Sequence, residues 1–261
     1  MENDNKDIIN TTISEIGKEV YNDAVSPSMK TVGKTLNGVV KIMLAPVRAL
    51  IWGWEKIEKC VTDGLEKRFK NSKPEELTNP DARVAVPVIQ ALQYSANEDF
   101  IREMFLNLLA NDMIKGNKAY IHPSYVEIIK QMSSLDAILL KVLSDKQKRF
   151  IKTINPNISV DKNSNQAYVG AFPECFLGFT IDGYSLFDIS ASLLHLQKFG
   201  LIDLMFDRTA GTDGYEELEK SDLLNIVLER YKQVNPNACL KFTKSIININ
   251  DYGKSFIKVC I

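Results

Sequence analysis

LNGVVKIMLAPVRALIWGWEKIEKCV, residues 36–61, carries apolar side chains at alternating intervals of four and three residues. These positions are Leu36, Val40, Met43, Val47, Leu50, Trp54, Ile57 and Val61. The spacing predicts a helix with one apolar stripe, and Lys34, Lys41 and Arg48 recur on the opposite face. Such a stripe needs a surface to pack against, which is the protein's own core, a partner helix or a lipid surface.

The charge of this stretch differs from that of the segment after it. Residues 29–73 contain ten Lys and Arg against four Asp and Glu, whereas residues 74–116 contain three basic and seven acidic residues. The basic segment therefore favours an anionic partner, and the acidic segment offers one within the same chain. We expect the acidic helix around residues 98–112 to lie beside the basic helix around residues 34–59.

The basic helix also mixes cations with tryptophan, which is typical of helices that lie in a membrane interface. The side chains expected at a partner or membrane surface are Lys34, Lys41, Arg48, Trp52, Trp54 and Lys56. A bundle core with a solvated basic face is the alternative. Residues 36–54 nearly reach the roughly 20 residues of a membrane span, but Lys41 and Arg48 would each cost about 2.5–3.5 kcal/mol in the hydrocarbon. Peripheral contact is therefore favoured over a true span.

Composition predicts a globular protein, because 45% of the 261 residues are hydrophobic and the net charge is only −1. The first twenty residues are polar and acidic and lack the pattern of a signal peptide, so the expected location is cytoplasmic, or peripheral at the inner face of the membrane. Four cysteines show no metal-binding or redox spacing and are interpreted as buried free thiols. They are Cys60, Cys175, Cys239 and Cys260.

Helical patterns predominate from residue 7 to about Lys152, including a first helix over residues 7–24 and a capping box at Ser133 and Asp136. After Asn155, Asn, Asp, Gly and Pro separate short alternating segments, which indicate loops and strands among further helices. The predicted fold class is mainly α, with an N-terminal helical hairpin or bundle followed by a smaller α+β winged-helix-like region. The predicted regions are an amphipathic helical hairpin at 1–73, a central helical region at 74–152 and the winged-helix-like region at 153–261.

Several strings, taken in order, resemble the Abi-alpha family of bacterial abortive-infection proteins. The resemblance covers most of the chain and implies a role in defence against bacteriophage. It brings no catalytic residues and no mechanism. The strings are VGKTLNGVVKIMLAPVRALIWGWEKIEK (32–59), NPDARVAVPVIQALQYSANEDFIREMFLNLLANDM (79–113), IHPSYVEIIKQMSSLDAILLKVL (121–143), LLHLQKFGLIDL (193–204) and INDYGKSFIKVC (249–260).

The carboxyl half resembles a winged helix more loosely, with a helix that stops at Gly200, a strand, a loop, a returning strand and a final helix. In winged helices that bind DNA, the helix before the first of these strands enters the major groove. Here that helix offers Lys198, Gln197 and His195 against Asp188. Because it is poor in cations that could contact phosphates, we expect a structural or protein-binding use, with nucleic-acid binding as the alternative function.

No catalytic constellation is evident. His122 and Pro123 form a turn that is either functional or simply orders the start of a helix, and His195 lies among leucines as a hydrogen-bonded histidine would. The chain contains no nucleophile elbow, phosphate loop, dinucleotide fingerprint or metal-ligand spacing. We therefore predict no catalytic, cofactor-binding or metal-binding residues, and an enzyme with an unrecognised site ranks last.

The functional hypothesis is an antiphage defence protein that binds a partner or a membrane surface through its basic amphipathic helix. The partner would be an unidentified protein or a phage component. Self-association and peripheral membrane contact stay open, and nucleic acid is not expected to be the partner.

Overall fold

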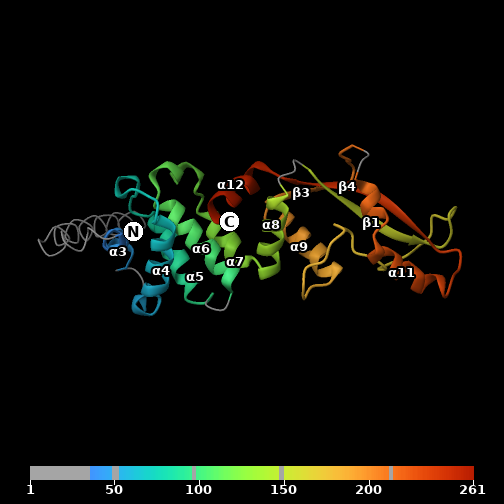
Figure 1. The fold of residues 1–261 in the computed structure, drawn as a ribbon, viewed down its shortest axis with the longest axis horizontal. Helices are drawn as coiled ribbons and strands as arrows, with labels where there is room; N and C mark the ends of the chain where they lie inside the picture. Colours follow the sequence, from blue (N-terminus) through green and yellow to red (C-terminus); the bar gives the residue numbers. More distant parts are fainter. Residues whose placement is uncertain (1–35, 49–52, 96–97, 147–149, 212–213) are drawn as a thin grey trace, which may run out of the picture. The chain divides into compact units, whose positions relative to one another are not determined.

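The computed structural model describes residues 36–48, 53–95, 98–146, 150–211 and 214–261. The predicted helix over residues 7–24 lies outside them. The chain divides into two compact units (Figure 1). Unit 1 extends to Gln131 and also includes Val259–Ile261, and unit 2 comprises Met132–Lys258. The described chain is mainly α with a small antiparallel sheet, as the sequence predicts.

Unit 1 opens with the predicted apolar stripe, which is divided between helix α3 (Leu36–Arg48) and helix α4 (Trp54–Phe69). The two helices pack against each other, and α4 begins after Gly53, whose positive φ of 74° suits glycine. Stripe members Val40, Val47 and Val61 are fully buried or nearly so, with exposed fractions of 0%, 2% and 0%. The stripe therefore packs into unit 1 itself.

The rest of unit 1 packs around these two helices. Its elements are the 3₁₀ turn η1 (Pro74–Glu76), α5 (Ala82–Leu92), α6 (Asp99–Asp112), the 3₁₀ turn η2 (Lys115–Tyr120) and α7 (Ser124–Gln131). Helix α5 contacts α3, α4, α6 and α7, and helix α6 contacts α4, α5 and α7.

Helices α4 and α6 are neighbours, which confirms this part of the expected pairing of basic and acidic segments. Arg68 of α4 donates from Nε to Asn107 Oδ1 at 2.7 Å and forms an ion pair with Glu103 at 2.7 Å. Close packing needs Gly64, since a Cβ there would lie 2.8 Å from a methyl carbon of Leu106. Apolar burial rather than charge provides most of the stability, because exposed ion pairs contribute only about 0–1 kcal/mol.

The end of α6 is joined to its neighbours by a buried carboxylate. Asp112, which is 1% exposed, accepts a hydrogen bond from the backbone nitrogen of Asp81 at 2.6 Å and pairs with Lys118 Nζ at 3.1 Å. Burial raises the pKa of Asp112, although these two donors favour its charged form. One side chain thus connects the start of α5, the end of α6 and η2.

Two asparagines of α6 hold the residues that return to unit 1 from the end of α12 (Asp251–Cys260). Asn107 Nδ2 donates to the carbonyl oxygens of Cys260 and Ile261 at 3.1 and 3.3 Å. Asn111 Nδ2 donates to the carbonyl oxygen of Val259 at 3.0 Å. Residues distant in sequence therefore complete the bundle.

Unit 2 is built on an antiparallel sheet with the strand order β2-β1-β4-β3. The strands are β1 (Ile151–Ser159), β2 (Ala167–Tyr168), β3 (Ile202–Met205) and β4 (Cys239–Ile249). The strand predicted after Gly200 and the returning strand predicted before the final helix are confirmed as β3 and β4. Strand β1 begins at Ile151, inside the stretch that was predicted to be helical to about Lys152, so this boundary was wrong.

The described helices of unit 2 lie before, between and after these strands in the sequence. They are α8 (Ser134–Asp145), α9 (Leu186–Lys198), α10 (Tyr215–Glu219), α11 (Asp222–Lys232) and most of α12. Helices α8 and α9 contact each other, and α9 contacts β3. Ser133 forms the predicted capping box with Asp136 at the start of α8.

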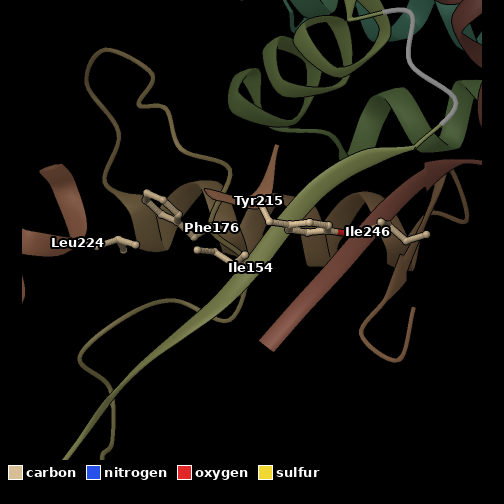
Figure 2. Close-up of a cluster of buried hydrophobic side chains, with 5 residues drawn as sticks. All are labelled: Ile154, Phe176, Tyr215, Leu224 and Ile246. Atoms are coloured by element: carbon tan, nitrogen blue, oxygen red, sulfur yellow. The ribbon is translucent and has the colours of Figure 1, made fainter. Parts of the chain in front are cut away.

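The apolar core of the sheet gathers side chains from both long strands, the loop at Phe176 and both α10 and α11 (Figure 2). Its buried members are Ile154, Phe176, Tyr215, Leu224 and Ile246. The hydroxyl group of Tyr215 donates to the carbonyl oxygen of Ser245 at 2.9 Å, so the buried phenol is satisfied.

A substitution at Gly253 of α12 can test how tightly unit 2 is packed. Alanine normally stabilises a helix over glycine by about 1 kcal/mol, but a Cβ at this position would overlap the carbonyl oxygen of Leu201. We expect Gly253→Ala to lose about 2–4 kcal/mol of unfolding free energy in urea titrations. Gly116→Ala is the control, because its Cβ meets nothing within 4 Å. Equal stability of the two variants would contradict the close contact.

Candidate functional site

The predicted partner surface is described only in part. Lys34 and Trp52, and the side chain of Lys56, lie outside the described residues. Lys41 and Arg48 are exposed on α3, and Lys41 pairs with Glu58 of α4 at 3.6 Å. Trp54 is 3% exposed and belongs to the core of unit 1. The described part of this surface therefore consists of cations rather than a mixture of cations and tryptophan.

The predicted turn at His122 and Pro123 orders the start of α7. The backbone nitrogen of Ser124 donates to His122 Nδ1 at 3.2 Å, and the Ser124 hydroxyl group lies 2.6 Å from the same nitrogen. Because a nitrogen that accepts from a backbone N–H carries no proton, Nδ1 is the acceptor in both contacts. His122 is exposed, and through these contacts its side chain caps the start of α7.

A different constellation lies in unit 2, where Asp136 is buried between α8 and α9. Its side chain is 1% exposed. Oδ1 accepts a hydrogen bond from Ser192 Oγ at 2.6 Å, and Oδ2 accepts from the backbone nitrogen of Ser133 at 2.8 Å. His195 Nδ1 lies 2.9 Å from the same Oδ2. One carboxylate thus caps α8 and also joins α8 to α9.

The geometry of this network determines the roles of its members. As a carboxylate, Asp136 only accepts hydrogen bonds, so the proton of the His195 contact lies on Nδ1 and Nε2 is the ring nitrogen left for a ligand. The imidazole also packs against the ring of Phe199, with the ring planes tilted by 42° and the centroids 4.4 Å apart. Ser192 donates to Asp136 and not to His195, which differs from the serine–histidine contact of a hydrolase triad.

An open pocket of about 540 Å³ lies beside this network. Its volume falls within the range of small-molecule sites, which run from about 300 to 1,000 Å³. Apolar walls predominate around a few convergent polar groups. The lining residues are Ser133, Leu135, Asp136, Tyr184, Asp188, Ala191, Ser192, Leu194, His195 and Lys198.

Sequence reasoning identified the cap at Asp136 and a hydrogen-bonded histidine at His195, but not that the two residues are partners. They lie 59 residues apart. The only available signal was indirect: a polar residue at the N3 position of a predicted helix and a histidine on an apolar helix face. Neither pattern indicates which helices pack together.

The cysteines do not form a reactive site in the part of the chain that the structure describes. Cys175 and Cys260 are buried, and burial raises the pKa of Cys175 to about 12 and that of Cys260 well above its usual value. Both therefore stay protonated near neutral pH. Cys60 and Cys239 are partly exposed. Within the described ranges, no group of three or more His, Cys, Asp or Glu side chains is placed to hold a metal ion.

No helix that the structure describes is long and apolar enough to cross a membrane. Fold and site together define a mainly helical protein in which a buried aspartate contacts a partly exposed histidine at a ligand-sized pocket. The family model described as abortive infection alpha matches residues 54–260, and the chain belongs to this family. The family links the protein to abortive infection, a defence against bacteriophage. No curated protein and no solved structure matches the chain.

The contribution of the buried Asp136 to stability can be tested by comparison with Asp188, which is exposed. Asp136 and Asp188 occupy the same position in two capping boxes, those of Ser133 and Ser185. An amide at Asp136 would place an NH₂ group against donors, so we expect Asp136→Asn to lose about 2–4 kcal/mol of unfolding free energy in urea. Asp188→Asn should lose clearly less, because water can reach that cap. Equal losses would show that the links to Ser192 and His195 contribute nothing.

Proposed function

We propose that the protein acts in abortive infection as a binding protein rather than as an enzyme, and that exposed cations of α3 and α4 meet an anionic partner. The observation that carries the defence role is the family match over residues 54–260. The partner is an acidic protein or phage component, with the anionic surface of a membrane as the alternative source of the same charge.

The packing of unit 1 supports cations as the contact residues. The described apolar stripe is buried, so what α3 and α4 offer to a partner is their polar side. Lys41, Arg48, Lys59 and Lys67 are exposed there, with Glu55 and Asp63 among them. Since exposed charges act mainly by steering and by summed attraction, the surface suits an acidic partner better than an apolar one.

The proposal predicts that reversing charge on α3 weakens defence without unfolding the protein. Plating efficiency of phage is measured on cells that express wild-type protein or Lys41→Glu/Arg48→Glu. We expect the variant to lose protection while its thermal unfolding changes little, because both side chains are exposed and an ion pair such as Lys41–Glu58 contributes only about 0–1 kcal/mol. Lys141→Glu/Lys162→Glu makes the same charge change at exposed positions of unit 2 and should still protect.

Liposome flotation separates the two sources of negative charge. If the partner is a membrane, wild-type protein floats with phosphatidylserine vesicles, and each lost cation costs about 1 kcal/mol of binding. If the partner is a protein, flotation is absent while the defence phenotype of the α3 variant remains. Full protection by Lys41→Glu/Arg48→Glu would refute this surface altogether.

A second candidate, a winged-helix nucleic-acid binder, is favoured by one observation. The strands β1, β4 and β3 are adjacent in that order, α8 precedes β1, α9 precedes β3 and α12 follows β4. This order is similar to that of a winged helix and would put α9 in the position of the recognition helix, although α10 and α11 stand between β3 and β4. However, Phe187 and Leu194 are exposed on α9, and Lys198 is its one Lys or Arg. Such a face is poorly suited to phosphates.

We therefore expect no tight binding to duplex DNA. Fluorescence anisotropy with a labelled duplex at about 50 and 200 mM salt measures this, because specific binders lose affinity steeply over that range. A nanomolar, salt-sensitive complex that disappears in Lys198→Glu would instead support the nucleic-acid function. Weak binding that is unchanged in this variant would leave α9 without a role in DNA recognition.

A further inference from the structure

We propose that the pocket beside Asp136 is a binding site for a small amphipathic anion. Its carboxylate or phosphate head group would lie on His195 and Lys198, and its apolar body would lie along Leu135, Ala191 and Leu194. The proposal is independent of the proposed function, because it uses side chains of α8 and α9 and none of α3 or α4.

The head-group end is prepared by the buried carboxylate. Asp136 holds His195 Nδ1 at 2.9 Å, which fixes the plane of the imidazole. When the imidazole is protonated, both ring nitrogens donate, and Nε2 then donates to the anionic head group. Lys198 follows His195 by three residues and therefore lies on the same face of α9. Its ammonium group makes no ion pair with the residues that the structure describes, so a ligand does not have to displace one.

The apolar part of the pocket lining is exposed to solvent. Leu194 is 41% exposed although it lines the pocket, and Ala191 is exposed one turn earlier on the same helix. Leu135 of α8 also lines the pocket and is 6% exposed. Covering such a wall with hydrocarbon is favourable, at about 25 cal/mol for each Å² removed from water.

The acidic groups of the pocket do not oppose an anion at this end. Asp136 is buried, and its oxygens are occupied by Ser133, Ser192 and His195. Asp188 accepts hydrogen bonds from the backbone nitrogen and the hydroxyl group of Ser185, at 2.8 and 2.7 Å. It precedes His195 by seven residues, which is about 10 Å along the helix. Lys198 and His195 therefore lie toward the C-terminal end of α9, and Asp188 lies in its first turn.

The protein contains two histidines, which makes the test direct. In full-length protein with ¹³C-labelled histidine, the Cε1–H signals of His122 and His195 are followed by NMR at fixed pH while decanoate is added below its micellar concentration. His195→Gln assigns the signals. We expect a saturable shift of the His195 signal and a constant His122 signal, because His122 lies outside the pocket and is bound to Ser124.

Three further arms decide whether the pocket selects an anion. Decyl phosphate should also bind, and the better of the two anions identifies the head group. Decanol has the same apolar body without the charge and should bind roughly tenfold more weakly or worse. Lys198→Gln should weaken both anions by about tenfold and leave decanol unchanged, whereas Lys141→Gln, outside the pocket, should change nothing.

Two results would overturn the proposal. Parallel shifts of both histidine signals, or no shift at all, would mean that the pocket does not bind these amphiphiles. Equal affinity for decanol and decanoate, or anion binding that is unaffected by Lys198→Gln, would remove the anion from the proposal.

Discussion

The hydrogen bonds that converge on Asp136 are the constraint on which unit 2 depends. A buried carboxylate is costly unless its oxygens are satisfied, and here the donors come from the start of α8 and from two turns of α9. The same bonds therefore set how α8 lies against α9 and how the imidazole of His195 is turned. Because the carboxylate is buried, it orients Ser192 and His195 but is not accessible to a ligand.

In unit 1, the constraint is the burial of one apolar stripe that two consecutive helices share. The stripe is divided between α3 and α4, and α4 begins after Gly53. Helix α4 can approach α6 closely because Gly64 has no side chain. Charge contributes at the edges, through Arg68 and Asp112. Other cations of these helices, Arg48, Lys59 and Lys67, are exposed at the surface of the bundle.

Local signals predicted the local features of the fold. Capping chemistry located α8, and alternation located β4. The extent of strand β1 was not predicted, because Asn155, Pro156 and Asn157 are residue types typical of turns. Pro156 is tolerated there because β2 pairs with β1 only at Ile158 and Ser159, so no neighbour needs the missing N–H on that side. Non-local partners, above all Asp136 with His195, depend on how helices pack, and one sequence does not contain that information.

The return of residues 259–261 to unit 1 has a consequence for biosynthesis. Asn107 and Asn111 of α6 emerge from the ribosome long before the carbonyl groups that they bind, and all of unit 2 is translated in between. Domains generally fold as units during synthesis, at about 5–20 residues per second. Most of unit 1 is therefore made before the segment that completes its bundle. A chain that is truncated within unit 2 lacks the carbonyl groups that Asn107 and Asn111 bind, so it cannot form all the hydrogen bonds of unit 1.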